Sequence, residues 1–380
     1  MAKGYLTAKQ ASQKLGISLS TLYAYVSRGL IRSEPDAVKR KRRYRSEDVE
    51  ALLQRKSQRL SNEKSLAGAL SWGEPICESE LTLIEQGELF YRGESLVGLL
   101  ESSTFEEVVG LLWGGYEAAD PVTGLESSSE LLPLQRFACV LPRMAVGDER
   151  AYDLRPESVR QTGSRILATL FNTLGAVKRG EPLVDALARV WCPRGRAELE
   201  AALIVSADHE LNVSTFTGRC IASSGATPYQ VVIGALAAMS GFRHGGYSYR
   251  VEALFREAKA LSAKEAVHSY LRRGASVPGF GHPLYPQGDP RGRELLRRVE
   301  LSEMASGLVQ AAEELLGEKP NIDFALVALS RSLSLPEGAP VALFTLGRCA
   351  GWIAHAIEQY ADKKLIRPRA RYVGRIPSDG

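Results

Sequence analysis

Residues 278–294 read PGFGHPLYPQGDPRGRE and place His282 nine residues before Arg291. Glycines flank this histidine on its N-terminal side, and prolines follow it closely. Proline fixes its own φ angle and restricts the residue before it, so the loop has little conformational freedom. An imidazole and a guanidinium held close together on a stiff loop indicate a binding or catalytic site.

The length and composition indicate an ordinary soluble globular protein. At 380 residues the chain can bury a large core over two or three domains without disulfides or metals. The five cysteines form no CxxC pair and show no regular spacing, which argues against a zinc site or a disulfide framework. The opening MAKGYLTAKQ lacks the apolar core of a signal peptide, and no run of the chain is typical of a membrane span. We therefore expect a cytoplasmic protein without membrane contact.

The charge is distributed unevenly along the chain. Residues 1–60 carry 14 Lys and Arg against 5 Asp and Glu, a net of +9, whereas the whole chain carries +4. The remaining 320 residues therefore carry a net of −5. A basic module is joined to a mildly acidic body, and this difference in sign indicates separate partners for the two parts.

The basic module has the pattern of two short helices around a glycine turn. Apolar residues recur at helical spacing over residues 6–15, stop at Gly16 and resume over residues 19–29. Ser18 or Ser20 can cap the second helix.

A cluster of six bases follows at residues 39–45, and Ser46 then begins another helix with acids in its first turn. This order resembles the winged helix-turn-helix of the MerR and excisionase type. The resemblance implies that the second helix enters a major groove while a basic hairpin touches the DNA backbone. The residues expected to face DNA are Ser20, Thr21, Tyr25, Arg40, Arg42 and Arg43.

An alternative interpretation of this module, in which its basic residues make no contact with DNA, also remains open. A run of charge often decorates a solvated turn, and Tyr23 fits a core position as well as a base-reading one. One module of this size offers few contacts, so useful affinity for DNA requires a dimer that presents two of them.

From about residue 61 onward the sequence predicts an almost wholly helical body. The segment TPYQVVIGALAAMSG begins with Thr227 as a cap and Pro228 at the first helical position. The segment LSAKEAVHSYLRRG begins with a capping box from Ser262 to Glu265. Each of the two segments ends at a glycine.

Three of the five histidines stand at expected helix ends or glycine turns. These are His209 in SADHELNVSTFTGR, His244 in GFRHGGYSY, and His282. A structural role fits any one of them alone, but the three together favour a site. His268 and His355 fall inside helical segments, so we expect a structural role for both.

Arg348 stands in APVALFTLGRCAGWIAHAIEQY, a stretch that is otherwise apolar. A buried guanidinium without a partner is costly, so Arg348 needs an anion, which is either a ligand or an internal Asp or Glu. Gly347 and Gly351 allow a neighbouring helix or a ligand to approach closely. Arg291 and Arg367 are further candidates for recognition of a carboxylate, although a surface position also fits either of them.

Asp323 is the candidate acidic residue to accompany these candidate arginines. It stands in EKPNIDFALVAL, near the start of a helix that Asn321 is expected to cap. An aspartate in a first helical turn commonly complements the helix dipole, so a purely structural role stays open for it.

Six motifs follow one another along the body. They are DHELNVSTFTGR, HGG, PGFGHPLYPQGDPR, PNIDF, FTLGRCAGWIAH and IRPRARY. In this order they resemble the citrate synthase family, and the upstream stretch LIEQGELFYRGESLVGLLESSTFEEVVGLLWGG resembles its early region. The resemblance covers roughly residues 75–375 and leaves the basic module outside.

The resemblance implies a mainly α-helical, two-domain homodimer with shared active sites. The expected domains are a winged helix-turn-helix domain at residues 1–60, a large domain at 61–245 and 331–380, and a small domain at 246–330 that closes over the cleft. The implied reaction condenses acetyl-CoA with oxaloacetate to citrate and CoA, a step of the tricarboxylic acid cycle. It calls for no metal and no cofactor beyond acetyl-CoA as co-substrate.

The resemblance also assigns roles to residues. His244 would stabilise the enol or enolate of acetyl-CoA while Asp323 removes the methyl proton. His282 would hydrogen-bond the ketone oxygen of oxaloacetate, and Arg291 would hold one of its carboxylates.

The remaining roles complete the pocket. Arg348 and His209 would line it, and Arg367 would reach it from the partner subunit. The loop Val277–Gly281 resembles the CoA-contacting segment, with Val277, Pro278, Gly279 and Gly281 as its expected contacts.

Two departures from the family pattern border the expected pocket. After HGG this chain has YSYR, which places Tyr247 and Tyr249 near His244, and after FGH it has Pro283 and Leu284. The alternatives are therefore a 2-methylcitrate synthase that uses propionyl-CoA, and a transcription regulator that keeps the pocket as a metabolite sensor. A further alternative is an enzyme whose basic module serves assembly and never touches double-stranded DNA.

Overall fold

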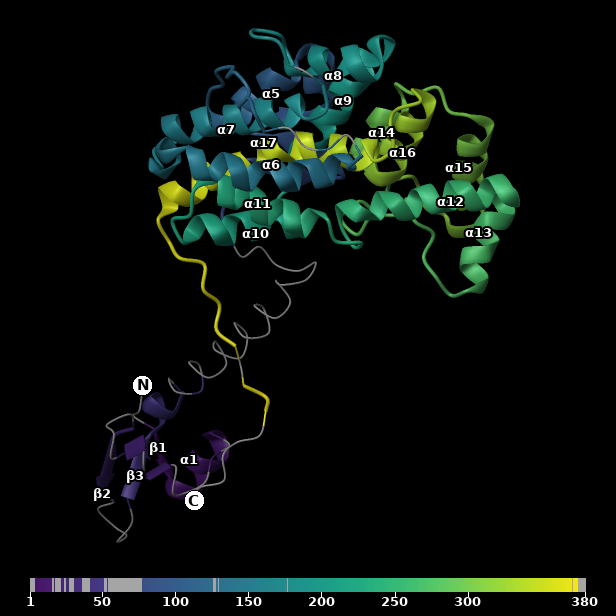
Figure 1. Cartoon of the computed structure of the whole chain (residues 1–380). Coiled ribbons are helices and arrows are strands. Elements are labelled where there is room, and N and C mark those ends of the chain that lie inside the picture. The colour runs from purple at the N-terminus through teal and green to yellow at the C-terminus, as the bar shows by residue number, and fades with distance from the viewer. Residues whose placement is uncertain are drawn as a thin grey trace. The chain divides into compact units, whose positions relative to one another are not determined.

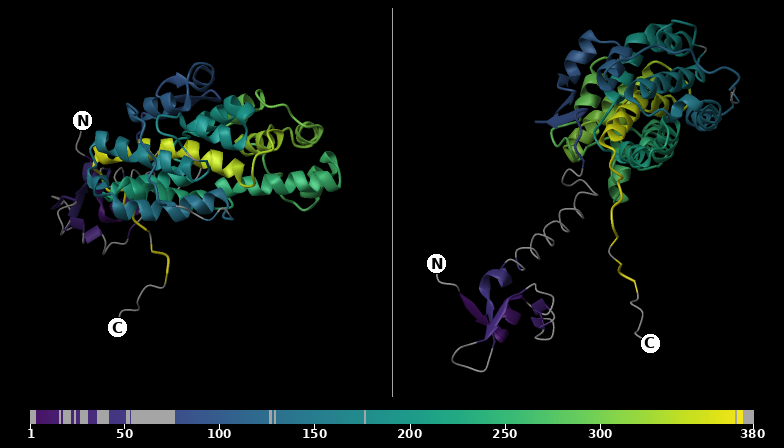
Figure 2. Two further views of the ribbon diagram at one scale, coloured as in Figure 1. Left: turned by 45° about the horizontal axis from the view of Figure 1, so that its top comes forward. Right: turned by 90° about the vertical axis from the view of Figure 1, so that its left-hand side faces the viewer.

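A computed structural model describes residues 4–15, 17, 22–23, 25–26, 31–35, 42–50, 53, 77–125, 128, 130–175, 177–370 and 372–374. The chain divides into two compact units, Met1–Glu78 and Ser79–Gly380. Each unit has its own hydrophobic core. The expected domain boundary near residue 60 lies outside the described residues. Figures 1 and 2 show the strands of the first unit in purple and the helices of the second from blue to yellow.

The first unit combines a small sheet with short helices. Strands β1 (Tyr5–Thr7), β2 (Ser33–Pro35) and β3 (Arg42–Arg45) form an antiparallel sheet in the order β1-β3-β2. Helix α1 (Ala8–Leu15) starts two residues later than the apolar period predicts, because Tyr5–Thr7 pairs with β3. Tyr44 lies in the middle of the sheet and packs into the core of this unit.

The arginines of strand β3 differ in whether they contact a partner within the unit or are exposed to solvent. Arg45 forms an ion pair with Glu34 at 2.6 Å, and Arg43 stacks over the ring of Tyr5 at 5.4 Å. Arg42 is exposed. Tyr25 is half-buried, whereas Tyr23 is 54% exposed and therefore no core residue.

The expected DNA-facing residues Ser20, Thr21 and Arg40 lie outside the described residues.

The second unit is a helical body, as the sequence predicts. Its α-helices are α4 (Leu96–Ser102), α5 (Phe105–Trp113), α6 (Pro133–Gly147), α7 (Pro156–Asn172), α8 (Leu183–Trp191), α9 (Arg196–Ser206), α10 (Val213–Ser223), α11 (Pro228–Met239), α12 (Ser248–Ala260), α13 (Ala263–Arg272), α14 (Pro290–Leu296), α15 (Glu303–Leu316), α16 (Ile322–Ser332) and α17 (Ala339–Asp362). Short 3-10 helices lie at η1 (Glu149–Tyr152), η2 (Pro193–Gly195) and η3 (Gly245–Tyr247).

The mainly helical body also contains a small sheet that the sequence analysis did not anticipate. Strands β4 (Thr82–Glu85), β5 (Glu88–Tyr91) and β6 (Glu94–Ser95) are antiparallel and consecutive. The two connecting turns use left-handed residues, with Gly87 at φ 81° and Gly93 at φ 86°. Gln86 and Arg92 also have positive φ, at 53° and 47°, so both residues of each turn adopt the conformation of a type I′ hairpin, with glycine at the second position.

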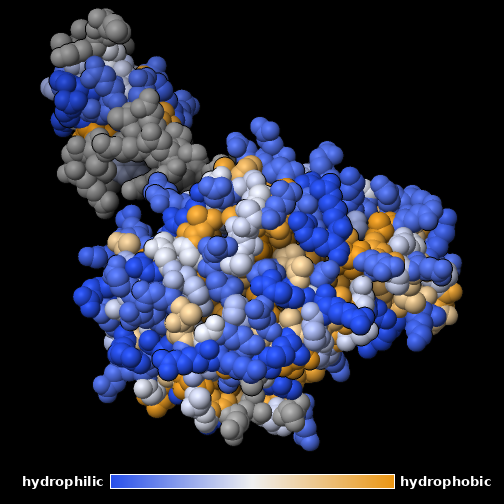
Figure 3. Space-filling model, turned by 90° about the horizontal axis from the view of Figure 1, so that it is seen from above, coloured by the Kyte–Doolittle hydropathy of each residue, from blue (hydrophilic) through white to orange (hydrophobic). Residues whose placement is uncertain are grey.

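Helix α17 is the central element of the body. It packs against α7, α9, α10 and α11 and runs between them in Figure 1. By length and composition it is also the one described helix that could span a membrane, but 94% of its most apolar window is buried inside the protein. Its apolar composition therefore reflects a core position. The face of the body in Figure 3 is largely hydrophilic, with scattered hydrophobic patches.

The predicted helix starts agree closely with the structure. Helix α11 begins at Pro228 directly after Thr227, although the Thr227 side chain makes no capping hydrogen bond to the backbone. Helix α13 follows Ser262, whose hydroxyl accepts from the backbone N–H of Glu265. The second half of that predicted capping box is replaced, because the Glu265 carboxylate pairs with Arg272 at 2.6 Å.

A second, smaller hydrophobic core lies at one end of the body. Its buried residues all fall between Val251 and Ala328, and they come from α12, α13, α15, α16 and the loop before α14. This core lies within the stretch expected to form the small domain, 246–330. The domain bounds themselves stay a prediction.

Candidate active site

The first two site histidines lie against each other. The rings of His209, which follows α9, and His282 meet edge to face with centroids 5.4 Å apart. Nε2 of His209 lies 2.8 Å from the hydroxyl of Tyr285, and the His282 ring lies 5.0 Å from the Tyr285 ring. Tyr285 therefore sets the position of both imidazoles.

Both imidazoles favour the neutral form. Burial lowers the pKa of His282 to about 4, and the Arg291 guanidinium acts in the same direction. Burial likewise holds the pKa of His209 well below its ordinary value, and Arg291 and Arg348 add to the effect. Neutral imidazoles can donate hydrogen bonds to a ligand without adding charge.

Arg291 is the second residue of helix α14, and a carboxylate of the chain itself holds it. Its Nε and Nη2 donate to the two carboxylate oxygens of Asp289 at 2.9 and 2.8 Å. Asp289 Oδ2 also accepts from the backbone N–H of Ile322, the first residue of α16. Burial disfavours the charge on Arg291, but Asp289 outweighs it and raises the pKa of the guanidinium. The pair orients Arg291 and leaves Nη1 outside the fork with Asp289.

Arg348 lies in the middle of α17 and is 1% exposed. Its Nε donates to the carbonyl oxygen of Ser206 at 2.8 Å, and its guanidinium lies 4.8 Å over the ring of Phe344. Its Nη2 has no hydrogen-bond partner among the described residues. Burial lowers the pKa of Arg348 to about 10, and Asp208 acts against this. A buried guanidinium with an unused donor is suited to an anionic ligand.

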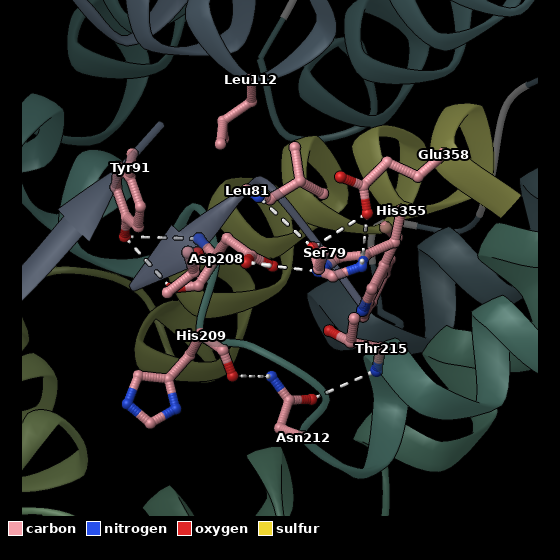
Figure 4. Close-up of polar contacts among 12 residues, drawn as sticks. Ser79, Leu81, Tyr91, Leu112, Asp208, His209, Asn212, Thr215, His355 and Glu358 are labelled. Atoms are coloured by element: carbon pink, nitrogen blue, oxygen red, sulfur yellow. Dashed lines mark hydrogen bonds and ion pairs between the residues drawn. The ribbon is translucent and has the colours of Figure 1, made fainter. Parts of the chain in front are cut away.

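Asp208 is the internal acid beside Arg348. It is fully buried, and its Oδ2 accepts a hydrogen bond from Thr82 at 2.5 Å. Figure 4 shows Asp208 between Tyr91 and His355, directly ahead of His209. Burial opposes ionisation, but the hydrogen bonds from His355 and Thr82, together with the charge of Arg348, outweigh it and lower the pKa of Asp208. The sequence alone left open an internal partner for Arg348, and the structure supplies one that offsets its charge without forming a direct ion pair.

Glycines make this arrangement possible. A methyl group at Gly351 would overlap Oδ1 of Asp208, and one at Gly347 would lie 2.5 Å from the carbonyl oxygen of Leu203. The close approach predicted from Gly347 and Gly351 is therefore that of α17 to the end of α9.

His244 is the third site histidine. Its Nε2 lies 2.8 Å from the hydroxyl of Ser214, the second residue of α10, and its ring stands on edge to Phe344 at 6.0 Å. Burial lowers the pKa of His244 to about 4, and Arg348 and Arg291 act in the same direction. His244 is therefore neutral, and Ser214 holds one of its two nitrogens.

The turn after His244 is tightly packed. A methyl group at Gly245 would overlap the sulfur of Met239, and one at Gly246 would lie 2.9 Å from the carbonyl oxygen of Ser240. Tyr247 is the first residue after these glycines to carry a side chain, and its ring packs against the second core with Arg250 stacked 4.8 Å over it.

Asp323 lies in the first turn of α16. Asn321 caps this helix as predicted, since its Oδ1 accepts from the backbone N–H groups of Asp323 and Phe324. Burial raises the pKa of Asp323 to about 7, while Arg291 lowers it and Asp289 raises it. Because Arg348 also acts on this carboxyl, Asp323 belongs to the same electrostatic cluster as both arginines. Its pKa suits a general base near neutral pH.

The loop Val277–Gly281 is fastened to the segment before α16. Gly281 N–H donates to the carbonyl oxygen of Lys319 at 2.9 Å, and Asn321 N–H donates to that of Gly279 at 2.9 Å. Val277 is buried in the second core. Gly279 has φ 89° and Gly281 φ 71°, and added methyl groups would meet Phe324 and Glu318. The backbone groups named here bond within the protein, so the glycines serve packing; contact of this loop with CoA stays a prediction.

Arg367 is the expected site residue that this single chain does not bring to the cluster. Its side chain is exposed, in the segment after α17. Its expected arrival from a partner subunit stays a prediction.

Sequence reasoning missed Asp208, Ser214 and Tyr285. The signals were present, because Asp208 directly precedes His209 and Tyr285 follows His282 by three residues. Their partners lie far away in sequence, however, and no local pattern reveals such pairs. Among the described residues no group of three or more His, Cys, Asp or Glu side chains could hold a metal ion.

Comparison with known proteins decides the family. Residues 134–369 match the family model described as citrate synthase, C-terminal domain. The chain belongs to the citrate synthase family. Residues 5–57 match a helix-turn-helix domain, which confirms the helix-turn-helix resemblance of the basic module, while its binding to DNA stays a prediction.

Relatives of the citrate synthase family resemble the chain over most of its length. It is 30% identical to a citrate synthase of Haloferax volcanii, covering 79% of this chain and 93% of the relative. It is 29% identical to 2-methylcitrate synthase 2 of Corynebacterium glutamicum, covering 76% and 90%. The crystal structure of citrate synthase from Thermotoga maritima matches with a TM-score of 0.64 and 28% identity, covering 81% of this chain and 96% of that one.

Proposed function

We propose that this protein is a citrate synthase-type acyltransferase that condenses acetyl-CoA with oxaloacetate. The observation that carries the proposal is the grouping of Asp323, with its raised pKa, and the buried Arg348, with an unused donor, in one electrostatic cluster. A base that is half ionised near neutral pH and a cation that lacks an anion are the two parts that this reaction needs.

The first step is removal of a proton from the acetyl methyl group. The Asp323 carboxylate takes this proton, and its burial strengthens it as a base. The electrons of the broken C–H bond move to the thioester oxygen, which neutral His244 stabilises as a hydrogen-bond donor. Such a preorganised donor is typically worth a few kcal/mol in the transition state.

The second step forms the carbon–carbon bond. Arg291, Arg348 and His209 hold the two carboxylates of oxaloacetate, and His282 donates to its ketone oxygen. The enol carbon attacks that ketone carbon, and hydrolysis of the resulting thioester releases CoA. Closure of residues 246–330 over the cleft excludes water while the bond forms.

The partner arrangement is part of the same proposal. Arg367 reaches the pocket of the second subunit, so the active form is a homodimer in the cytoplasm that serves the tricarboxylic acid cycle. The reaction needs no cofactor beyond acetyl-CoA, which the loop Val277–Gly281 contacts.

The helix-turn-helix unit binds double-stranded DNA in this proposal. Its support is the family match over residues 5–57 and the net charge of residues 1–60. Arg42 and Arg43 of β3, with Arg40, contact the backbone, and Ser20, Thr21 and Tyr25 face the groove. A titration of the full chain with duplex DNA tests this, since phosphate contacts make affinity fall steeply with salt.

Two alternatives have an observation in their favour. The similarity to a 2-methylcitrate synthase favours propionyl-CoA as the acyl donor. The helix-turn-helix match favours a transcription regulator that uses the pocket as a metabolite sensor.

One assay separates the alternatives. Purified protein is mixed with oxaloacetate and either acetyl-CoA or propionyl-CoA, and free thiol is followed with a chromogenic reagent. Thiol release well above a His244→Ala control supports the synthase, and the better acyl donor decides between the two enzymes. Release no greater than that of the control, with tight binding of oxaloacetate, supports the sensor.

A further inference from the structure

His355 lies on the same face of α17 as Arg348, two turns further along. It is 1% exposed, and its ring lies between Asp208 and Arg219 (Figure 4 shows it beside Asp208). Its place inside an apolar helical segment predicts only a structural role for it. One of its ring nitrogens, however, contacts a hydrogen-bond donor, the Arg219 guanidinium, and the other contacts an acceptor, the Asp208 carboxylate.

The neighbour of Nδ1 fixes the position of the proton on His355. Nη1 of Arg219 lies 3.2 Å from Nδ1, and a guanidinium nitrogen can only donate a hydrogen bond. Nδ1 must therefore be the unprotonated, accepting nitrogen. The ring proton is then on Nε2, which lies 3.3 Å from Oδ2 of Asp208 and donates to it.

Arg219 is itself held from the far side. Its Nη1 donates to Oε2 of Glu358 at 3.0 Å, and its Nε donates to Oε1 of Gln359 at 2.8 Å. Its side chain is 4% exposed, so water competes little for these contacts. The guanidinium therefore cannot turn away from His355 without breaking buried hydrogen bonds.

We propose that His355 is a positioning residue of the oxaloacetate pocket: in its Nε2-protonated form it fixes the Asp208 carboxylate beside Arg348. Asp208 Oδ2 is held by Thr82 from one side and by His355 from the other. Its Oδ1 lies against Gly351, one turn along α17 from Arg348.

The consequence for the pocket follows from charge and connectivity. Asp208 offsets the charge of the buried Arg348, and it is joined directly to His209. Without the donor on His355, a buried carboxylate loses one of its hydrogen bonds and tends to shift or take up a proton. Arg348 and His209 would then be held less firmly in the positions that, under the proposed function, bind oxaloacetate.

Steady-state kinetics test the role under the proposed function. His355→Leu removes the donor, and we expect KM for oxaloacetate to rise about tenfold or more, since a hydrogen bond to a buried charge is lost. KM for acetyl-CoA should change much less. His355→Gln carries an amide N–H to a position near that of Nε2 and should recover most of the affinity for oxaloacetate. His268→Gln, on the outer helix α13, is the matched control and should match the wild type.

An equal rise of both KM values in His355→Leu, or no recovery in His355→Gln, would overturn the proposal. If His355→Leu does not fold, the comparison of His355→Gln with the wild type still decides, because a large rise in KM for oxaloacetate there also contradicts it.

The protonation of His355 is testable without any activity. With five histidines in the chain, ¹⁵N-labelled histidine gives few signals, and His355→Gln and His268→Gln assign two of them. In the wild type we expect a pyrrole-type signal for Nε2 of His355 and a pyridine-type signal for Nδ1. Arg219→Leu should allow the second tautomer to appear. A pyrrole-type Nδ1, or a fully protonated ring, in the wild type would refute the proposal even if the enzyme is active, and an inactive enzyme with the expected signals would instead count against the proposed function.

Discussion

Asp289 and Arg291 form a bidentate ion pair that is almost completely buried, with their side chains 0% and 3% exposed. The same aspartate accepts from the backbone at Ile322, so the pair also joins the starts of α14 and α16. Since α16 carries Asp323, one carboxylate orients the expected substrate-binding arginine and anchors the helix that presents the expected base.

Asp289→Asn should therefore be strongly destabilising. Removing one partner of a buried pair leaves an uncompensated charge and costs about 3–5 kcal/mol. The free energy of unfolding, measured with a chemical denaturant, is the readout. Asp120→Asn breaks an exposed pair with Arg179, whose side chains are 63% and 92% exposed, and is the matched control, for which little change is expected. Equal stability losses in the two variants would contradict the importance of burial here.

The activity should depend on pH through Asp323. Its pKa of about 7 means that the base form is lost as the pH falls below neutrality. We expect kcat to rise with pH up to about 7 and then to level off, and Asp323→Asn should lower kcat by about 100-fold or more. Steady-state kinetics over a pH series is the measurement. A kcat that stays constant between about pH 5 and about pH 8 would contradict this role of Asp323.

The Asp323 carboxyl should affect stability in the opposite direction to activity, because its ionisation destabilises the folded state. The folded-state pKa is about 7 against an ordinary value of 3.8, so the folded state holds this proton more tightly, and stability is lost as the pH rises from about 4 to 7. Above that interval Asp323→Asn should stabilise the protein, by roughly 2–4 kcal/mol, since each pH unit of displacement corresponds to about 1.4 kcal/mol. Thermal unfolding at about pH 5 and about pH 8, on either side of the folded-state pKa, measures it, and a variant less stable than the wild type at the higher pH would refute the assignment.

Ser214 should matter to catalysis although it is not expected to touch substrate. Its hydroxyl accepts from Trp352 Nε1 at 3.1 Å, and its single proton can go either to Nε2 of His244 at 2.8 Å or to Oδ1 of Asn212 at 2.9 Å. Donation to Nε2 leaves the proton of the neutral ring on Nδ1, which is the form that the proposed donor role of His244 needs. Ser214→Ala should lower kcat about tenfold, because the imidazole loses the partner that orients it. KM values should change little. Ser240→Ala, at an exposed hydroxyl that bonds only to a backbone carbonyl, is the control. A kcat for Ser214→Ala equal to that of the control would show that His244 is held by packing alone.

Tyr247 should influence which acyl group is accepted. It follows the tightly packed glycine turn after His244, and the Asp323 carboxylate contributes to the rise in the pKa of its phenol, after burial. We therefore expect the Tyr247 ring to border the acyl group and to limit the space beyond a methyl group. Tyr247→Ala should therefore raise the ratio of kcat/KM for propionyl-CoA to that for acetyl-CoA about tenfold or more, which is the usual worth of one methylene. Tyr249→Ala, which is 39% exposed, should leave the ratio unchanged, and an unchanged ratio in both variants would exclude this role.

Two arginines of β3 should behave differently in DNA binding. Arg42 is exposed, so Arg42→Ala should weaken binding and reduce the slope of log affinity against log salt by about 1. Arg45 is committed to Glu34, so Arg45→Ala should mainly loosen the helix-turn-helix unit. Fluorescence anisotropy over a salt series and thermal unfolding separate the two effects. A slope that Arg42→Ala leaves unchanged would place this arginine away from phosphate.

Much of the body could be predicted because its signals are local. Pro228, Ser262 and Asn321 mark helix starts through their own backbone preferences and capping groups, and all three stand where the sequence placed them. Arg348 could be recognised by a local signal as well, because it is a cation within an apolar run. The strands β4 to β6 were missed because a helical interpretation of the surroundings outweighed two short Gly-containing turns.

The rest of the site depends on contacts that no local pattern encodes. Asp208 meets Thr82 across 126 positions and His355 across 147. His355 looked like an ordinary core histidine because its neighbours along α17 are apolar, and its partners come from α10 and from the loop after α9. Contacts between charged residues that are distant in sequence become visible only in the folded structure, even where the order of motifs is clear.

The Glu358 carboxylate, which anchors Arg219, also accepts hydrogen bonds from Ser79 Oγ at 2.9 Å and from the backbone N–H of Glu80 at 2.8 Å. The first residues of the helical body are thus tied to the last turn of its final helix. Ends that lie side by side tolerate rearrangement of chain order. A circularly permuted body, opened at a surface loop and rejoined near Ser79, should therefore fold, and other modules can be attached in front of Ser79 without opening the helical core.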